Sequence, residues 1–439
     1  MSVRAKSPRS SVRVVVAAAL GNALEWFDFI IYGYLAVILS RLFFPAADQN
    51  VALMLTLATF AVGFVMRPVG ALVMGYHADR KGRRSALTIT IWIMALATAM
   101  IGFAPTYATV GLLAPLIVLT ARLMQGFAAS GEYGSAVSLL AESAPPHRKA
   151  TFVAWQMAST LLAVVFAGFV GFLLFNTLTP QQMGEWGWRL PFIFGLLIAP
   201  VGYYIRRHVD ETIDVASVAR TSWADDIRDI WTNQRRAFLT SFALLAFGGG
   251  NFYIMFIYMP TFAVRELNLG LNAPFISTLV AGLLSAAGAI FWAGRVDRGA
   301  SPRLLYGCAT VAILLIVYPL YAWIIQTPTL WGLVALQVAL AIPGSVIVGL
   351  GIVMNAALFE PRIRASVLGF NFNVSNSIFG GAAPLMVSYA VAATGNKAAA
   401  AYYVILVGLI GLIGVCLLPE RARAPQRQEG LGEPNGAPA

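Results

Sequence analysis

Twelve apolar stretches, separated by short polar segments, follow one another along almost the whole chain. Each has about 20 residues or more, enough for a helix to cross about 30 Å of hydrocarbon. The alternation of apolar and polar residues that is typical of outer-membrane strands is absent from the sequence. The pattern predicts an all-α membrane protein with spans near 14–43, 52–76, 85–105, 110–141, 151–176, 187–206, 237–263, 272–294, 304–326, 330–358, 365–394 and 399–418.

The longest polar interruption, 207–236, separates six predicted spans from six more. Similar basic loops follow spans 2 and 8, at 75–84 and 294–299, and similar acidic-to-basic segments follow spans 4 and 10. Matching signals after matching spans indicate a duplicated six-helix unit, which predicts two pseudo-symmetric bundles. The predicted organisation is an N-terminal bundle at 1–206, a linker at 207–236, a C-terminal bundle at 237–418 and a disordered tail at 419–439.

Composition supports a lipid environment. The chain is 59% hydrophobic and only 11% charged, with a mean hydropathy of +0.75. Soluble domains are closer to half apolar and a quarter charged. A chain this apolar lacks the residues for a polar surface, and no part of it resembles a separate soluble domain.

The net charge of +11 is distributed asymmetrically. Most Lys and Arg residues lie in the terminal segments and in the loops after even-numbered spans, which leaves only Arg41, Arg189, Arg265 and Lys397 in the other loops. The positive-inside rule predicts that both termini and the linker are cytoplasmic, in a bacterial-type inner membrane. The basic charge therefore reports topology, and we do not expect nucleic-acid binding. The first apolar run is too long for a signal peptide and is interpreted as span 1.

Two carboxylates lie inside span 1. Glu25, Asp28 and Tyr32 are spaced to share one helical face. Charged residues within a membrane span are costly and are usually functional. We predict that Asp28 or Glu25 carries a coupling proton. The alternative is a structural salt bridge to Arg67 or Arg122.

Span 4 carries the residues best suited to an organic anion. Arg122 and Gln125 share a face, and a guanidinium group can bind a carboxylate through two parallel hydrogen bonds. We predict that Arg122 contacts substrate, with a structural Arg–Asp pair as the alternative. Glu132, further along the span, is a second candidate proton carrier. Arg67 precedes Pro68 in span 2 and is predicted to pair with a span 1 carboxylate or with carbonyls at a kink, in a gating role.

Neutral polar side chains in other spans are candidates for the wall of the same cavity. The alternative for each is a hydrogen bond to a neighbouring helix. They are Gln156, Asn251, Tyr253, Asn355, Asn371, Asn373 and Asn376.

The loop after span 2 predicts a gate. Asp79 can lie against a helix N-terminus, and Arg80, Arg83 and Arg84 can pair with acids of the other bundle. Glu142, after span 4, is predicted to take part in the same gate. The alternative is a loop whose charge serves only topology, which does not require the aspartate.

We expect no catalytic activity and no cofactor other than transported protons. The three histidines lie in loops or at span ends, without metal or triad spacing, and no phosphate-binding Gly-rich loop is present in the sequence.

These residues resemble the major facilitator superfamily. The loop at 75–84 is similar to its signature after span 2, and Arg122 to its intramembrane arginine. One branch, the metabolite:H+ symporters, is closer, and within it the citrate and tricarballylate carriers. Two features depart from the family pattern: Ser130-Gly131-Glu132 replaces Gly-Gly-Glu, and the loop at 294–299 is degenerate. The segments that carry the likeness to the branch are 21–33, 43–45, 66–71, 122–127 and 185–192, and those to the citrate carriers are 53–56, 155–156 and 379–384.

The resemblance implies a proton-coupled importer that works by alternating access in the lipid bilayer, and we expect the monomer to be functional. The expected substrate is a di- or tricarboxylate such as citrate, bound by Arg122 with help from Tyr32, Gln156 and Asn371. The alternatives are a betaine or proline symporter, an exporter of amphipathic compounds, and a membrane receptor that does not transport.

Overall fold

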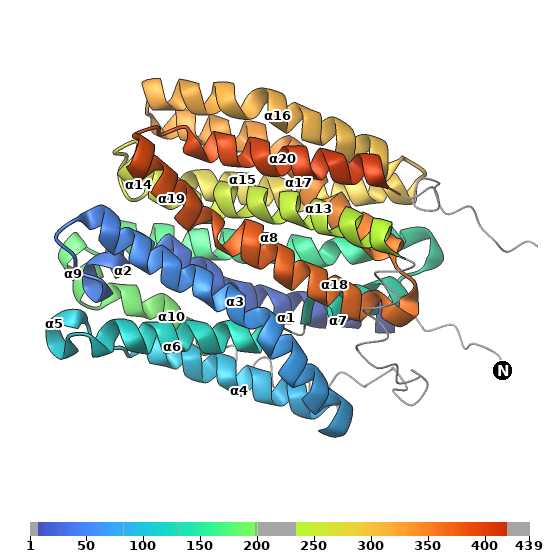
Figure 1. The fold of residues 1–439 in the computed structure, drawn as a ribbon, viewed down its shortest axis with the longest axis horizontal. Coiled ribbons are helices and arrows are strands. Elements are labelled where there is room, and N and C mark those ends of the chain that lie inside the picture. Colours follow the sequence, from blue (N-terminus) through green and yellow to red (C-terminus); the bar gives the residue numbers. More distant parts are fainter. Residues whose placement is uncertain (1–7, 82, 131, 198–199, 201–233, 419–439) are drawn as a thin grey trace, which may run out of the picture.

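The protein is a bundle of long helices that run back and forth along a common direction (Figure 1). The computed structural model describes residues 8–81, 83–130, 132–197, 200 and 234–418. The first half contains α1 (Pro8–Tyr34), α2 (Ala36–Phe43), α3 (Gln49–Lys81), α4 (Arg83–Gly102), α5 (Tyr107–Val110), α6 (Leu113–Ala128), α7 (Glu132–Ser143), the 3₁₀ turn η1 (Pro146–Arg148), α8 (Lys149–Thr177), α9 (Pro180–Glu185), the 3₁₀ turn η2 (Gly187–Arg189) and α10 (Leu190–Gly195). The second half contains α13 (Arg235–Phe252), the π-helical turn η4 (Tyr253–Tyr258), α14 (Met259–Arg265), α15 (Ala273–Asp297), α16 (Pro302–Gln326), α17 (Leu330–Leu358), α18 (Pro361–Ser375), the π-helical turn η5 (Asn376–Gly381), α19 (Ala383–Thr394) and α20 (Ala399–Leu417).

The prediction of an all-α membrane protein is confirmed. Among the described residues, nine helices are long and apolar enough to cross a membrane, and the bent pair of α1 and α2 makes ten. The shorter apolar helix Thr88–Gly102 occupies the predicted third span. The predicted sixth span is described through α10 and lies partly outside the described residues.

Two predicted spans are interrupted rather than continuous. Span 1 bends by 66° between α1 and α2, where Leu35 has φ −91° and ψ 4°. Span 4 is divided into α6 and α7, and the Ser130 hydroxyl donates to the Phe127 carbonyl at the division. A serine that bonds to a preceding carbonyl competes with the helical hydrogen bonds. These interruptions were not visible in the hydrophobic pattern.

Several helices begin where the sequence supplies a starting signal. Pro180, Pro302 and Pro361 are the first residues of α9, α16 and α18, where a missing N–H costs nothing. Thr329 is the N-cap of α17, because its hydroxyl accepts a hydrogen bond from the Gly332 N–H at 3.0 Å.

We call the two ends of the bundle the terminal end and the distal end. The terminal end carries the end of α3, the start of α4 and the turns at 144–148, 298–301 and 359–360 (Figure 1). The distal end carries the turns at 44–48, 103–106, 178–179, 266–272, 327–329 and 395–398.

Close helix crossings rely on glycine. A Cβ atom on Gly126 of α6 would collide with the Gly63 carbonyl of α3, and one on Gly134 of α7 would collide with the Ala365 carbonyl of α18. In lipid there is little hydrophobic drive between helices, so close backbone packing contributes much of their association. The first crossing places α6 beside α3, and the second joins the two halves.

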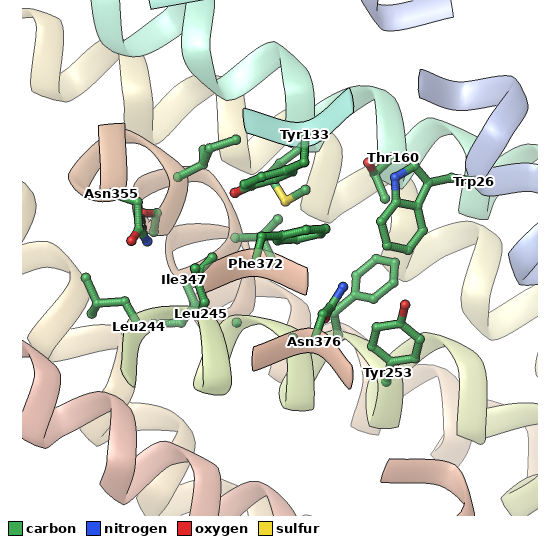
Figure 2. A pocket seen from close by; sticks show the side chains of 17 residues that line it. Trp26, Tyr133, Thr160, Leu244, Leu245, Tyr253, Ile347, Asn355, Phe372 and Asn376 are labelled. Atoms are coloured by element: carbon green, nitrogen blue, oxygen red, sulfur yellow. Dashed lines mark hydrogen bonds between the residues drawn. The ribbon is translucent and has the colours of Figure 1, made fainter. Parts of the chain in front are cut away.

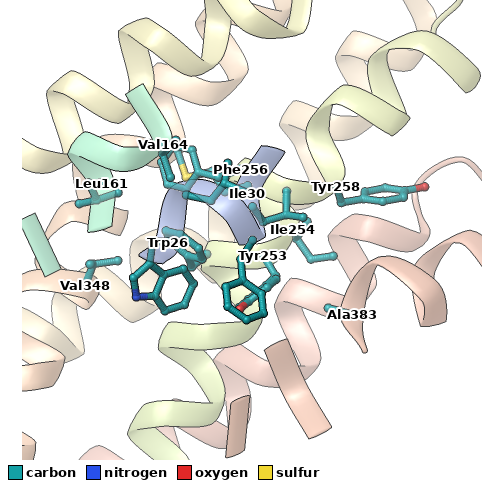
Figure 3. Packing of buried hydrophobic residues seen from close by; sticks show 14 of the residues in the cluster. Trp26, Ile30, Leu161, Val164, Tyr253, Ile254, Phe256, Tyr258, Val348 and Ala383 are labelled. Carbon is teal, nitrogen blue, oxygen red and sulfur yellow. The ribbon is translucent and has the colours of Figure 1, made fainter. Parts of the chain in front are cut away.

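One hydrophobic core extends across both halves of the chain. Figure 3 shows its centre, where residues of α1 and α8 face residues of η4 and α17. They include Trp26, Ile30, Leu161, Val164, Tyr253, Ile254, Phe256 and Val348. The predicted division into two bundles stays a prediction. Most of the predicted linker and all of the predicted tail lie outside the described residues.

Candidate substrate and proton site

A cavity lies between the two halves near the middle of the bundle (Figure 2). It has about 50 Å³ of space for the centres of water-sized molecules, and about 10–15 Å³ is enough for one water. Its wall is mainly apolar and aromatic. The side chains that give it character are Trp26, Tyr133, Met157 and Thr160 from the first half and Phe252, Tyr253, Asn355, Phe372 and Asn376 from the second.

An aromatic pair joins the halves at this cavity. The rings of Tyr133 in α7 and Phe372 in α18 stack with centroids 3.6 Å apart and planes 7° from parallel (Figure 2). Both helices run from the cavity to the terminal end. The pair lies beside the middle of the cavity, between Asn355 and Leu244 on one side and Trp26 and Tyr253 on the other (Figure 2).

Arg122 is fully buried in the first half and is surrounded by rings. Its guanidinium carbon lies 4.5 Å from the ring centre of Tyr32, 4.8 Å from that of Phe29 and 4.9 Å from that of Phe60. Cation–π contacts of this kind stabilise a desolvated cation by about 2 kcal/mol. The aromatic surroundings replace part of the lost hydration.

Arg67 contacts the ring of the same phenylalanine, Phe29. Its guanidinium carbon is 4.7 Å from the Phe29 ring and 4.5 Å from the Phe64 ring. The charges of Arg67 and Arg122 repel each other, and both attract the polar end of Tyr253. Since Tyr253 also lines the cavity, it connects the arginine pair with the cavity.

The arginine pair retains unused hydrogen-bond donors. Nε and Nη2 of Arg122 and Nε of Arg67 are buried without a hydrogen-bond partner, as is the Tyr253 hydroxyl. Buried donors are normally satisfied, and an unsatisfied charged donor is expensive. Four buried donors close to one another define a site that favours an anion.

A chain of hydrogen bonds links Arg122 to Asp28. Arg122 Nη1 donates to Gln125 Oε1 at 2.8 Å, and Gln125 Nε2 donates to Thr98 Oγ1 at 3.1 Å. The Thr98 hydroxyl then donates to Asp28 Oδ2. Asp28 is fully buried, its second oxygen has no hydrogen-bond partner, and a Cβ on Gly195 would collide with that oxygen. The arginine and the aspartate thus communicate through two neutral side chains, without direct contact.

Glu25 lies one turn before Asp28 in α1 and interacts electrostatically with Arg67. The first half therefore brings together two cations and two acids. Glu25, Asp28, Arg67, Arg122 and Gln125, all predicted from the sequence, are in one region. Arg67, predicted to pair with a span 1 carboxylate or with carbonyls at a kink in a gating role, also lies in this buried region, and its gating role stays a prediction.

The other predicted substrate residues are more scattered. Tyr32 contacts Arg122 through its ring, and its hydroxyl donates to the Thr56 carbonyl at 3.3 Å. Tyr253 lines the cavity. Gln156, Asn251 and Asn371 do not line it.

Each of these three amides has a place in helix packing. Gln156 donates to Asn22 Oδ1 at 2.8 Å, and Asn371 donates to the Phe238 carbonyl at 3.2 Å. Asn251 is buried where α13 passes Gly344. In this conformation they fit the alternative given above, hydrogen bonding and packing between helices.

The predicted gate is described only in part. The side chains of Asp79, Arg80, Arg83, Arg84 and Glu132 lie outside the described residues. Glu142 is exposed at the end of α7, and its charge attracts Arg364 at the start of α18. An acid of the first half thus faces a cation of the second.

Asp297 is a contact between the halves that the sequence analysis missed. It ends α15, and its carboxylate accepts from the N–H groups of Ala150 and Thr151 at 2.9 Å each and from the Thr151 hydroxyl at 2.6 Å. A carboxylate at a helix N-terminus satisfies free N–H groups and the helix dipole. The aspartate in the loop at 294–299 was the available signal.

The distal end has contacts between the halves as well. Arg265 at the end of α14 donates to Gln49 Oε1 at 2.8 Å and to Asn50 Oδ1 at 2.6 Å. Asn272 donates to Asn176 Oδ1 at 3.0 Å. The halves therefore touch on both sides of the central cavity.

A multi-pass helical bundle with a cavity between its halves and charged groups buried beside it is the architecture of a membrane transporter. The model of the Major Facilitator Superfamily matches residues 18–336, and the chain belongs to this family. Solved structures agree in fold: a D-xylose-proton symporter superposes with a TM-score of 0.73 at 16% identity, covering 94% of this chain and 98% of that one. The human organic anion transporter MFSD10 gives 0.66 at 17% identity, covering 94% of this chain and all of that one.

Sequence relatives are more informative about the branch. The citrate-proton symporter of Salmonella typhi is 34% identical, with 94% of this chain and 95% of the relative covered. That of Klebsiella pneumoniae is 31% identical, with 94% and 92% covered. The proline/betaine transporter of Escherichia coli K12 is 32% identical, with 94% and 84% covered. The predicted resemblance to the superfamily and to citrate-proton symporters is confirmed, and the chain is a proton-coupled transporter of this superfamily.

Proposed function

We propose that this protein imports a small di- or tricarboxylate, such as citrate, together with protons. The observation that carries the proposal is the buried pair Arg67 and Arg122, with donors that no protein group uses. A carboxylate suits a guanidinium group, because it can accept two parallel hydrogen bonds from it. Tyr253, which contacts the cavity and is attracted by both arginines, is the proposed first contact of the substrate on its way to them.

The coupling follows from the balance of buried charge. Two arginines face two carboxylates, Glu25 and Asp28, so the region is close to neutral when both acids are ionised. Protonation of either acid leaves a buried positive charge without compensation, which is expensive in a membrane interior. A substrate carboxylate supplies that compensation. Proton binding and anion binding therefore favour each other.

The hydrogen-bond chain transmits this effect to Arg122. With Asp28 ionised, the Thr98 proton points to the carboxylate, so Thr98 accepts from Gln125 and Gln125 accepts from Arg122. Protonation of Asp28 removes the charge that orients the chain. We infer that Arg122 is then released to bind substrate. Glu132 stays an alternative proton carrier on sequence grounds.

Alternating access is the proposed transport cycle, with the two halves of the chain as the moving units. Contacts at the terminal end, through Asp297, and at the distal end, through Arg265, would break in turn. Following the distribution of Lys and Arg, we place the terminal end and both termini in the cytoplasm of a bacterial-type inner membrane. We propose that the monomer is the working unit.

One observation favours a second candidate, a zwitterion such as betaine or proline. The cavity wall is rich in rings: Trp26, Phe252 and Tyr253 meet there, with centroids 5.5–6.4 Å apart. Aromatic faces attract quaternary ammonium groups. In that case the ammonium group would occupy the cavity and the carboxylate would face the arginine pair.

Uptake into proteoliposomes distinguishes these candidates. Labelled citrate is offered with and without an inward proton gradient and competed with tricarballylate, 2-oxoglutarate, proline and betaine. Gradient-driven citrate uptake that only the carboxylates inhibit supports the proposal. Entry of betaine or proline with exclusion of citrate would overturn it in favour of the second candidate.

A further inference from the structure

A second pocket opens at the distal end, separate from the central cavity. It has about 210 Å³ of space and lies where α2, the start of α3 and the end of α14 meet. Figure 1 shows α2 and α14 at the end of the bundle opposite α7 and the start of α18. Its wall consists of Val37, Ser40, Arg41, Pro45, Ala46, Gln49, Ala52, Leu53 and Arg265.

The charge of this wall is distinctive. Of the four cations that the sequence assigns to the distal loops, Arg41 and Arg265 line this one pocket, and no acidic residue lines it. Two carboxylates lie nearby. Asp48 accepts from the Asn50 N–H at 2.7 Å, and Glu266 attracts both Arg265 and Lys397. Three cations against two acids leave this corner positive.

Arg265 also holds the halves together. Its two donors bind the neutral amide oxygens of Gln49 and Asn50 on α3. A carboxylate is a stronger acceptor than an amide, because charge-assisted hydrogen bonds are roughly twice as strong as neutral ones. An anion in the pocket can therefore displace these amides from Arg265.

We propose that this pocket is an outer capture site for a carboxylate substrate, and that its occupation releases the contact of Arg265 with Gln49 and Asn50. Arg41 and Arg265 hold the anion, and the loss of the amide contacts allows the distal end to open. Substrate then triggers its own entry toward the arginine pair. The inference rests on the proposed import of carboxylates.

The test measures opening directly and does not depend on transport. Cys308 and Cys416 are replaced with serine, and spin labels are attached through Ala47→Cys and Gly270→Cys, one on each side of the Arg265 contact. Ala47 is exposed, and a Cβ on Gly270 meets no atom within 4 Å. The distance between the labels is recorded during a citrate titration in phosphatidylcholine nanodiscs.

Three variants separate capture from release. Citrate is expected to lengthen the distance in the parent protein, and Arg41→Gln to raise the citrate concentration for half the effect about tenfold, as expected for loss of one charged partner. Gln49→Ala with Asn50→Ala removes the amides and keeps both cations, so the long distance is expected without citrate. Arg189→Gln is the matched control and should behave like the parent, because Arg189 is a distal cation that bonds to the Glu185 and Ala104 carbonyls and does not line the pocket.

The outcomes are decisive for each proposal separately. Opening by citrate that Arg41→Gln weakens supports the capture site, even if citrate is not transported and the proposed substrate fails. Citrate uptake with no change in label distance, or with an Arg41→Gln variant equal to the parent, overturns the capture site and leaves the proposed function intact. Opening by phosphatidylglycerol in place of phosphatidylcholine, without citrate, assigns the pocket to a lipid headgroup and overturns capture of substrate.

Discussion

The two halves of this transporter differ in the polar groups that they bury. Among the described residues, the buried Asp, Glu, Lys and Arg side chains are Asp28, Arg67 and Arg122, and all three lie in the first half. The described part of the second half buries neutral polar groups, such as Asn251, Gln337, Asn355, Asn371, Asn373 and Asn376. A charged side chain in the membrane interior costs free energy, and grouping such side chains in one half lets cations and acids compensate one another. The comparison indicates that the first half holds the charge chemistry and the second half supplies a neutral wall that can move against it.

The strongest challenge to this division is removal of Arg122. In Arg122→Gln, Asp28 and Glu25 remain beside a single arginine. The variant loses the two charge-assisted hydrogen bonds proposed to hold the substrate carboxylate, each worth about 1.5–3 kcal/mol, so we expect citrate uptake to fall by at least about 100-fold. Uptake into proteoliposomes measures the loss, with thermal unfolding to show that the variant is folded.

Two further variants sharpen this result. Arg122→Lys keeps the charge but loses the planar fork, and we expect only partial recovery. Arg189→Gln removes a cation at the distal end and should retain most of the uptake. An Arg122→Gln protein with normal citrate affinity would contradict the assignment of the carboxylate to the first half.

Loss of Asp28 tests the acid side of the same half. Asp28→Asn keeps the shape but cannot change its charge, so a proton gradient should no longer drive accumulation. Exchange of internal for external citrate should persist, because exchange requires no net proton movement. The expected loss of accumulation is about tenfold or more, in line with the contribution of a positioned proton carrier.

The measurement is uptake with a gradient compared with counterflow without one. Asp48→Asn, an exposed aspartate of the distal end, is the control. Retention of gradient-driven accumulation in Asp28→Asn would instead assign the coupling proton to Glu25 or Glu132.

Asp297 is an acid of the second half that bonds to the first half, at the N-terminus of α8. Asp297→Asn weakens three hydrogen bonds and removes a favourable helix-dipole contact worth up to about 2 kcal/mol. We expect a shift of about tenfold toward opening at the terminal end. A cysteine at Gly248, a cavity residue whose Cβ would meet open space, reports opening through its alkylation by an impermeant maleimide added from that side.

The background for this test lacks Cys308 and Cys416. Glu360→Gln, an exposed acid of the same end, is the control and should leave the alkylation rate unchanged. Equal rates in Asp297→Asn and the parent would show that this contact does not hold the terminal end closed.

The smallest effect is expected within the neutral wall. Both asparagines donate to a backbone carbonyl and keep an unbonded buried carbonyl oxygen, but Asn355 lines the cavity and Asn371 does not. A neutral hydrogen bond contributes about 1 kcal/mol, so Asn355→Ala should raise KM about fivefold. Asn371→Ala should lower Tm and leave KM nearly unchanged. The opposite pattern in the two variants would place the path beside Asn371.

The fold could be predicted from the sequence because each span is long and apolar in itself. Local spacing also predicted contacts within one helix. Arg122 and Gln125 were expected on one face, and they are hydrogen-bonded. The duplicated loops pointed to the second-half position at which Asp297 lies.

Contacts between helices could not be predicted in the same way. Thr98 is one hydroxyl in an apolar helix, and nothing in the sequence around it indicates that it joins Gln125 to Asp28. Phe29, Phe60 and Phe64 are ordinary residues of apolar spans, yet they surround the two arginines. Both features depend on which helix faces which, and the hydrophobic pattern does not specify this.

The two π-helical turns have a consequence for how the cavity could evolve. Tyr253 begins η4 and Asn376 begins η5, and both residues line the cavity. A π-helical turn accommodates one residue more than an α-helical turn and is often found at functional sites. Deletion of one residue in either turn would convert it to an ordinary α-helical turn and change which side chains of that turn face the cavity. A single-codon deletion could therefore present a new set of side chains to the substrate while the rest of the helix keeps its length and its neighbours.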